Sequence, residues 1–304
     1  MVLRVFIVVS LLFIGTNSGA QTDPGLIERQ LTTIVNRPGY RTWKDTSTLH
    51  AVARYIESEF RLATDNVRRQ SFNIEFQTYW NVVALVGDTT KPRIVIGAHY
   101  DVCEEQHGAD DNGSGVVGLI QALHQLKNYS GDYCLEFVAY TLEEPPFFSS
   151  NYMGSAVHAR SLKERGVEVR GMVSLEMIGY FSDEKDSQSY PLKFLKLFYG
   201  NKGDYITLVR RMNKGGFTRS FCRKYKRADK VKTRLFTGPR SLPGIDFSDH
   251  RNYWNEGYDA LMITDTAFYR NKNYHKTTDT VQTLDFVRMA KVIDAFVEAI
   301  NSLK

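Results

Sequence analysis

Cysteine is scarce in this sequence, and long hydrophobic runs are absent beyond its first twenty residues. Three cysteines in 304 residues allow at most one disulfide and leave at least one thiol unpaired. No segment after residue 20 is long and apolar enough to cross a membrane. Neither an internal repeat nor a flexible linker divides the chain, and its 42% hydrophobic and 24% charged residues are typical of a protein with a folded core. We therefore expect one globular domain over residues 21–304.

The first twenty residues differ in composition from the rest. The segment MVLRVFIVVSLLFIGTNSGA combines one early arginine, an apolar run over residues 5–15 and a small polar end. Ser18 and Ala20 have the spacing that a signal peptidase recognises. An uncleaved membrane anchor is the alternative, but the apolar run is shorter than the roughly 20 residues that span a bilayer. We predict a signal peptide at 1–20, cleaved after Ala20, and hence an exported protein.

The three cysteines lie in different contexts. Cys103 follows the predicted strand 93–100, whereas Cys134 begins the next one, so parallel strands would hold the two thiols at opposite edges of the sheet. A bond between Cys103 and Cys222 is possible on the sequence alone. Free, partly buried thiols are the simplest expectation.

Positive charge is concentrated in one stretch. The net charge is +5, yet residues 210–234 hold eleven Lys and Arg against one acid, an excess of +10, which leaves the remainder at −5. A basic stripe can bind nucleic acid. Few aromatic residues accompany this one, and the protein is predicted to be exported, so a solvated loop or helix face is the favoured interpretation. No nucleic-acid partner is expected.

Hydrophobic periodicity indicates an alternation of helices and strands. Predicted helices cover 24–35, 41–64, 113–128, 153–166 and 283–303, and predicted strands cover 67–76, 79–88, 93–100, 134–144, 169–181 and 259–269. Strands that alternate with helices between residues 93 and 181 predict parallel βαβ crossovers within one sheet. Residues 183–250 contain several Gly and Pro breaks and give no clear pattern.

Metal-binding residue types stand where the predicted strands end, and few basic residues stand beside them. Ligands of open α/β sheets bind beyond the carboxyl ends of the strands. Five separate segments place polar residues there: His99 and Asp101, Asp111, the pair Glu143 and Glu144, Glu176, and His275.

Each residue also has an ordinary structural interpretation. His99 could be a satisfied histidine at a strand end, Asp111 a helix N-cap and Glu176 a chance terminus. The adjacent pair Glu143 and Glu144 is harder to explain, because two buried carboxylates repel each other and resist ionisation. A divalent cation among them would remove this cost.

Two histidines with several carboxylates favour zinc in a catalytic site, since structural zinc sites are usually rich in cysteine. Asp111 has two carboxylate oxygens and could bridge two ions ~3.5–4 Å apart, as in two-metal hydrolases. Asp101, two residues beyond His99, is placed to accept the other ring N–H of that histidine and so fix its tautomer.

These motifs resemble the exported co-catalytic zinc aminopeptidases, a family that includes bacterial leucyl aminopeptidase, the Streptomyces aminopeptidase and aminopeptidase Y. The matching segments, between about residues 80 and 280, are GAHYD, GADDNGSG, LEE, SLEMIGY, FSDH and YHKTTDT. The resemblance implies an α/β fold with a mixed, mainly parallel central sheet sandwiched between helices. It also implies that residues 21–304 form a single zinc peptidase domain that acts on peptides with a free N-terminus.

The resemblance further implies a role for each site residue. His99 and Glu176 would hold one Zn²⁺, Glu144 and His275 a second, and Asp111 would bridge them. Glu143 would be the general base and acid, and Asp101 would orient His99.

Two departures from the family pattern bear on this reading. Relatives commonly have Asp at the position of Glu176, and the loop 104–108 is shorter than in many of them. Glu176 in place of Asp could change the metal geometry, and the shorter loop 104–108 could reshape the mouth of the site. The donor that stabilises the oxyanion is not assigned by the sequence, and Tyr269, Arg270 and Tyr274 are candidates by proximity.

Two alternatives to an aminopeptidase remain open on the sequence. A glutaminyl-peptide cyclotransferase shares the fold and a similar metal rim, but it typically holds one zinc. A non-catalytic metal-binding relative would be expected to lose Glu143, which this chain retains.

Overall fold

The computed structural model describes residues 21–212 and 215–304. The predicted signal peptide at 1–20 lies outside the described residues. In the part of the chain that the structure describes, no helix has the length and apolarity to traverse a bilayer.

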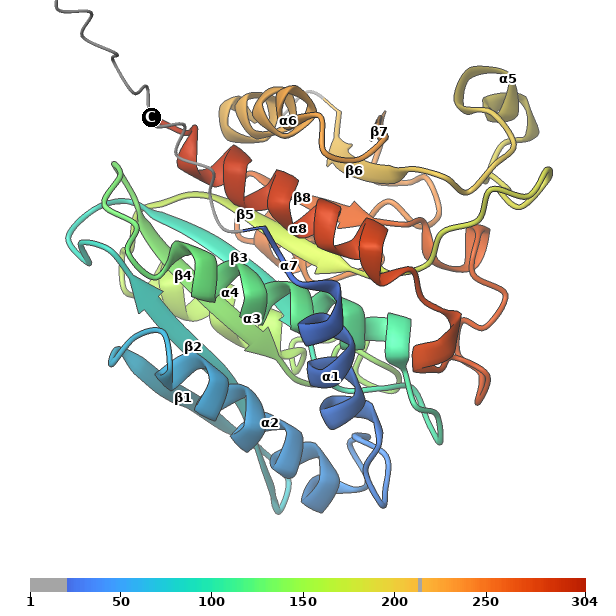
Figure 1. Cartoon of the computed structure of the whole chain (residues 1–304). Coiled ribbons are helices and arrows are strands. Elements are labelled where there is room, and N and C mark those ends of the chain that lie inside the picture. The colour runs from blue at the N-terminus through green and yellow to red at the C-terminus, as the bar shows by residue number, and fades with distance from the viewer. Residues whose placement is uncertain (1–20, 213–214) are drawn as a thin grey trace, which may run out of the picture.

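Eight strands form a single mixed sheet in the order β1-β2-β4-β3-β5-β8-β6-β7 (Figure 1). Their bounds are β1 Val67–Ile74, β2 Gln77–Val86, β3 Arg93–His99, β4 Cys134–Tyr140, β5 Val169–Glu176, β6 Ile206–Arg211, β7 Thr233–Gly238 and β8 Ala260–Thr264. The four central strands β4, β3, β5 and β8 run parallel. β1 and β2 add to one edge in antiparallel pairing, and β6, antiparallel to β8, carries β7 on the other edge.

Helices cover both faces of this sheet. They are α1 Pro24–Val35, α2 Thr46–Arg61, α3 Gly115–Leu126, α4 Gly154–Glu164, α5 Lys196–Tyr199, α6 Gly216–Ala228, α7 His250–Asn255 and α8 Phe286–Asn301. One face packs against α1, α2, α3, α6 and α8 in the larger hydrophobic core, and the other packs against α4 and α7 in a smaller one (Figure 1). The expected mixed, mainly parallel sheet between two helical layers is confirmed.

Local sequence signals account for the starts of two helices, α2 and α8. The Asp45 side chain accepts a hydrogen bond from the backbone N–H of Thr48 at 3.0 Å, which caps α2. Asp285 caps α8 in the same way through Arg288 N–H at 2.8 Å. Side chains such as Leu31, Leu119 and Phe296 are buried in the core between these helices and the sheet, and each stabilises the fold by about 1.5–3 kcal/mol.

All six predicted strands end earlier than the hydrophobic pattern predicts, three of them by one or two residues and the other three by four or five. The predicted strand 134–144 ends at Tyr140, the one over 169–181 ends at Glu176, and the one over 259–269 ends at Thr264. Left-handed backbone at Leu142 (φ 59°) and Met177 (φ 49°) lies just past the first two strand ends, and extended pairing cannot continue through it. The residues beyond these ends therefore form loops at the carboxyl edge of the sheet.

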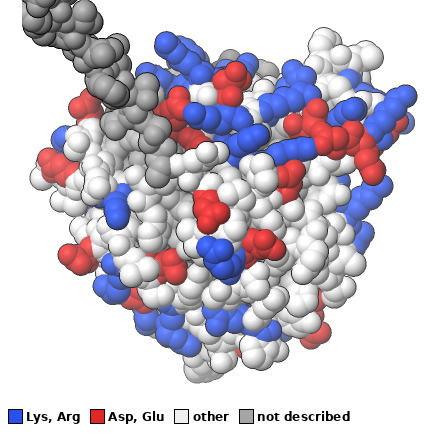
Figure 2. All heavy atoms as spheres, in the orientation of Figure 1, with Lys and Arg blue, Asp and Glu red and all other residues white. Residues whose placement is uncertain are grey.

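Residues 183–250, which gave no clear sequence pattern, contain β6, α6 and β7. The basic stretch lies here, and α6 exposes Arg219, Arg223, Lys226 and Arg227 while it buries Phe221. Figure 2 shows Lys and Arg gathered on the side of the molecule where Figure 1 places α6 and β7. Part of the stretch is thus the solvated face of an amphipathic helix, as expected, and the other described basic residues lie on β6, on β7 and in the loop between α6 and β7.

All three cysteines are free. Cys134 and Cys222 are buried, and Cys103 is partly exposed in the loop after β3. Burial raises the pKa of the Cys134 thiol to about 11, so this thiol stays protonated at neutral pH. The expectation of unpaired thiols is confirmed.

Candidate metal centre

The structure brings the sequence-predicted site residues together at the carboxyl edge of the central strands. His99 and Glu176 are the last residues of β3 and β5. Glu143 and Glu144 follow β4, and His275 lies in the loop after β8. Asp111 lies in the turn Ala109–Ser114 that leads into α3. All of these side chains except His275 are buried.

Asp111 lies between the two histidines. His99 Nε2 is 3.5 Å from one Asp111 carboxylate oxygen, and His275 Nε2 is 3.2 Å from the other. Glu176 approaches His99 Nε2 to 3.4 Å, and Glu144 approaches His275 Nε2 to 3.3 Å. The residues therefore form two adjacent groups that share one carboxylate.

No Lys or Arg in the described ranges lies within ion-pair distance of Asp101, Asp111, Glu143, Glu144 or Glu176; the basic side chains at that distance are the two histidines. Arg41 is buried nearby, but its guanidinium donates to the backbone carbonyls of His107 and Gly108. Burial lowers the pKa of Arg41 to about 10, which leaves it charged at neutral pH. Arg41 thus tethers the loop before Asp111 and does not neutralise the carboxylates directly.

Burial and mutual repulsion disturb the ionisation of these groups. Burial raises the pKa of Glu143 well above its usual value, and the charges of Glu144 and Glu176 add to the effect against the opposing influence of His99. Burial and Asp111 raise the pKa of Glu144 to about 7. Groups that resist ionisation so strongly when crowded together are typical of a site completed by a cation.

Several polar atoms in this cluster are buried without a hydrogen-bond partner among the described residues. They are His99 Nδ1, His275 Nε2, Asp111 Oδ2 and Glu144 Oε1. An unsatisfied buried polar atom costs about 1–3 kcal/mol. A divalent cation bound to imidazole and carboxylate donors would satisfy three of these four atoms, namely His275 Nε2, Asp111 Oδ2 and Glu144 Oε1. The donor set therefore fits Zn²⁺, which binds His and Asp/Glu.

The backbone around Asp111 is held by neighbouring groups. Gly108 has φ 60°, and a Cβ there would lie 2.3 Å from the Asp111 carbonyl oxygen, so only glycine fits. Asp279 accepts hydrogen bonds from the backbone N–H groups of Asp110 and Asp111. These contacts fix the direction in which the Asp111 side chain leaves the turn.

Glu176 is positioned by a buried serine. Ser248 Oγ donates to Glu176 Oε2 at 2.8 Å and lies 2.8 Å from Ser174 Oγ. The Glu176 carboxylate therefore has a specific partner in this chain.

Asp101 does not accept the hydrogen bond from the His99 ring that the sequence led us to expect. His99 Nδ1 is 3.6 Å from Asp101 Oδ1, which is longer than a hydrogen bond. The two Asp101 oxygens instead accept hydrogen bonds from the backbone N–H groups of Glu143 at 3.1 Å and Glu144 at 3.0 Å. In this structure Asp101 therefore positions the loop that carries both glutamates.

The three sequence-proposed oxyanion donors have different surroundings. Arg270 donates to Gln188 and to the Tyr180 carbonyl and stacks on Tyr205, so its guanidinium is engaged elsewhere. Tyr269 and Tyr274 both line the pocket beside the cluster. Tyr274 also stacks on the His275 ring at a centroid distance of 3.8 Å.

An apolar pocket of about 230 Å³ opens beside the cluster. Asp111, Glu143, Glu144, Glu176 and His275 form one wall. The other walls are mainly aromatic and aliphatic and include Phe148, Tyr205, Val209, Phe236, Phe247 and Met262. None of the described residues that line the pocket is Lys or Arg. Much of this wall comes from residues 183–250, the part of the sequence that gave no clear pattern.

Sequence reasoning did not assign roles to Asp279, Ser248 or Cys103. Asp279 and Ser248 lie in the YHKTTDT and FSDH segments, so their position in recognisable motifs was the available signal. Cys103 lies four residues beyond His99 but outside the matching segments, so no motif marks it.

Comparison with known proteins agrees with this geometry. The model of the family described as Peptidase family M28 matches residues 81–300. The uncharacterised protein YfbL of Escherichia coli K12 is 38% identical over 93% of this chain and 89% of its own length. A probable leucine aminopeptidase 1 of Trichophyton verrucosum is 28% identical over 74% of this chain, which spans 59% of that relative.

Solved structures show the same fold at low identity. LapB from Legionella pneumophila has a TM-score of 0.72 and 20% identity, covering 92% of this chain and 72% of LapB. A glutaminyl cyclase from Bacteroides thetaiotaomicron has a TM-score of 0.68 and 15% identity, covering 94% and 99%. The family match spans more than half of the chain and includes the whole residue cluster described above. This chain belongs to peptidase family M28.

Proposed function

We propose that this chain is a zinc-dependent aminopeptidase that removes large apolar residues from the N-terminus of peptides. The observation that carries the proposal is the placement of Asp111, with one carboxylate oxygen toward His99 and the other toward His275. His99 and Glu176 would hold one Zn²⁺ and Glu144 and His275 a second, with Asp111 as the bridge. When bound, the ions would polarise the scissile carbonyl and lower the pKa of water to around 7.

Glu143 is the residue we assign to proton transfer. Its carboxylate lies 3.8 Å from His99 Nε2, so it reaches the proposed metal cluster without being needed as a ligand. Glu143 would accept a proton from the attacking water and return it to the leaving amine. Asp101 would hold the Glu143 and Glu144 loop through the two backbone N–H groups it accepts.

The pocket supports recognition of the amino end of a substrate rather than the carboxyl end. Binding a terminal carboxylate needs a cationic partner, and the described residues that line the pocket include no Lys or Arg. The acidic wall formed by Asp111, Glu143 and Glu144 suits a terminal ammonium group. The aromatic and aliphatic walls suit a large apolar side chain at the substrate N-terminus.

A panel of aminoacyl-nitroanilides with a metal analysis tests this function. We expect two zinc ions per chain and faster hydrolysis of Leu and Phe substrates than of Gly, Asp or Lys substrates. The Val209→Trp variant, which would fill the pocket from β6, should lower kcat/KM for Phe more than for Ala, by about 10-fold or more. Equal losses on both substrates would count against the pocket assignment.

A glutaminyl-peptide cyclotransferase is the second candidate, supported by the likeness of fold to a glutaminyl cyclase. A peptide with N-terminal glutamine, assayed beside the nitroanilides, separates the two reactions. Metal binding without turnover of either class would instead indicate a non-catalytic metal-binding relative. Export remains a prediction from residues 1–20, tested by the N-terminal sequence of the mature protein.

A further inference from the structure

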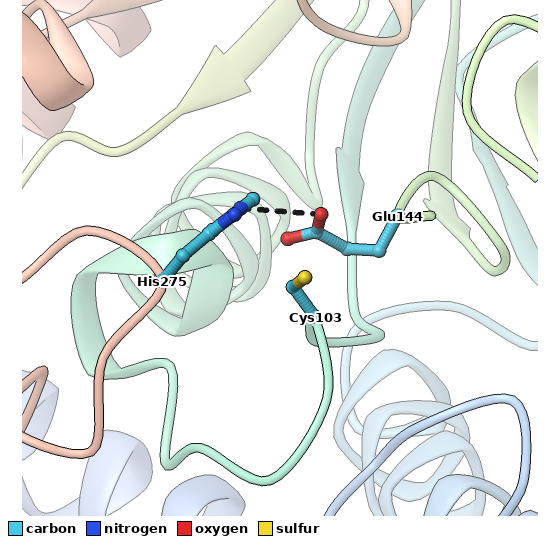
Figure 3. Close-up of side chains that lie close together, drawn as sticks. All are labelled: Cys103, Glu144 and His275. Carbon is cyan, nitrogen blue, oxygen red and sulfur yellow. Dashed lines mark ion pairs between the residues drawn. The ribbon is translucent and has the colours of Figure 1, made fainter. Parts of the chain in front are cut away.

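A cysteine thiol lies beside one half of the proposed metal cluster. Cys103 Sγ, a Glu144 carboxylate oxygen and a His275 ring nitrogen all lie within 4.8 Å of one another. Figure 3 shows the thiol directed toward the Glu144 carboxylate, which in turn faces the His275 ring. The three residues come from separate loops that follow β3, β4 and β8. Sulfur, oxygen and nitrogen donors thus converge at one point.

Two buried polar atoms at this point have no hydrogen-bond partner among the described residues. Glu144 is only 5% exposed, and its Oε1 atom has no hydrogen-bond partner among the described residues. His275 Nε2 is also without a hydrogen-bond partner there. Since zinc binds thiolate sulfur at ~2.3 Å and imidazole nitrogen at ~2.0–2.1 Å, donors around one ion lie within a few ångströms of one another. The observed spacing is compatible with such a centre.

We propose that Cys103 is a ligand of the divalent ion that Glu144 and His275 hold, an inference that rests on the proposed function. With Asp111 as the bridge, this ion would then have four protein ligands: Asp111, Glu144, His275 and Cys103. The ion on the other side would have three, namely Asp111, His99 and Glu176. Binding requires the thiolate, so the Cys103 S–H proton is released to solvent as the Zn²⁺–S bond forms.

The two halves of the centre would therefore differ in chemistry. A four-ligand set is typical of closed zinc sites, whereas three ligands leave a position open. The open position would lie on the His99 side, where Glu143 is also found. A thiolate donor further favours zinc over magnesium or manganese on the Cys103 side, so the two ions should differ in exchange rate and in selectivity.

Cobalt substitution of the full-length protein tests the assignment directly. Co²⁺ bound to a thiolate gives a sulfur-to-metal charge-transfer absorption in the near ultraviolet, which nitrogen and oxygen ligands do not give. We expect this band in the wild type once two equivalents of Co²⁺ are bound, because only one of the two ions has Cys103 as a ligand. It should be absent in Cys103→Ser and retained in Cys222→Ala, a matched control in which a thiol buried on α6 is removed.

A thiol titration on the wild type provides a test that needs no variant. Cys103 should react with a disulfide reagent in the metal-free protein and be protected at least ~10-fold by Zn²⁺. Cys103→Ser should also bind its second zinc at least ~10-fold more weakly than the wild type, by comparison with the usual effect of disturbing a metal site.

The outcomes separate this inference from the proposed function. If the wild type binds two Co²⁺ ions and hydrolyses peptides but shows no charge-transfer band, Cys103 is not a ligand and the aminopeptidase assignment stands. A band that persists in Cys103→Ser overturns the inference in the same way. If the wild type binds neither Co²⁺ nor Zn²⁺, the proposed function fails as well.

Discussion

The Asp279 carboxylate accepts a hydrogen bond from the backbone N–H of Asp111 at 3.0 Å, although the two residues are far apart in the sequence. It also accepts from Asp110 N–H at 3.0 Å. Burial and the charge of Asp110 raise the pKa of Asp279 to about 7. One buried carboxylate therefore fixes the turn that presents the proposed bridging ligand.

Asp279→Asn should weaken zinc binding, because the amide NH₂ group would face a backbone N–H and release the turn. We expect metal affinity to fall by about 10–100-fold, measured by competition with a chelator. Asp285→Asn is the matched control, since Asp285 caps α8 and Asn caps helices equally well. A normal affinity in Asp279→Asn would show that the turn holds itself without this contact.

Glu143→Gln should retain both metal ions and lose hydrolysis by at least ~10²-fold, because the amide cannot accept the proton from water. Metal content and kcat on a Leu-nitroanilide are the two measurements. Glu105→Gln, an exposed carboxylate of the nearby loop, serves as the control and should have normal activity. Near-normal turnover in Glu143→Gln would refute its role as the base.

Ser248→Ala should disturb only one of the two metal positions. The hydroxyl donates to Glu176 Oε2 at 2.8 Å, so its loss frees the carboxylate of the proposed ligand on the His99 side. We expect one zinc to bind about 10–100-fold more weakly and the other to bind normally, as resolved by stepwise metal titration. Equal weakening of both ions would contradict the division of ligands proposed here.

Tyr274→Phe should lower kcat and leave KM nearly unchanged if the phenol stabilises the oxyanion. Burial and the neighbouring carboxylates raise the pKa of Tyr274, so the hydroxyl stays protonated as a donor at neutral pH. Loss of one such donor typically costs about 10²–10³-fold in kcat. Tyr269→Phe is the comparison, and a larger loss in that variant would transfer the role to Tyr269.

We expect Glu136, which lies outside the proposed metal cluster, to make the free energy of unfolding depend on pH. It is fully buried in β4 and lies 2.9 Å from Arg93 Nη1. Burial alone would raise its pKa, but His158 and Arg93 outweigh burial and lower it from 4.5 to about 2. A lowered pKa stabilises the fold above pH 4.5, and this contribution is lost as the pH falls toward 2.

Glu136→Gln should therefore destabilise the protein by roughly 3 kcal/mol at pH 7 and flatten the decline in stability between pH 4.5 and 2. Urea unfolding at several pH values measures both effects. If the variant loses stability in acid as steeply as the wild type, other carboxylates dominate the acid response.

The sequence predicted the cluster because each proposed ligand lies at the end of a strand or beside a recognisable motif. His99 and Glu176 end buried apolar runs, and the parallel order of these runs places them on one edge. It could not predict the partners of Asp101. Asp101 lies two residues beyond His99, and this separation suggested a contact with the histidine ring. The pairing of β3 with β4 instead brings Asp101 to the backbone of Glu143 and Glu144.

The residues that form the pocket wall are the part of the site that the sequence predicted least well. Its wall depends on β6 and β7, which add to the sheet beyond β8, and the short apolar run in β6 is followed by basic residues. Burial of Val209 there results from tertiary packing with residues such as Ile245 and Trp254 rather than from a local period. Single-residue positioning by Ser248 or Asp279 likewise depends on contacts between distant segments.

The proposed ligands are distributed from the end of β3 to the loop after β8, with five further strands of the sheet between the first and the last of them. No contiguous fragment of the chain holds both histidines without the intervening strands. Long-range pairing of this kind is slow to form. The proposed metal centre should therefore form only once the whole sheet is assembled.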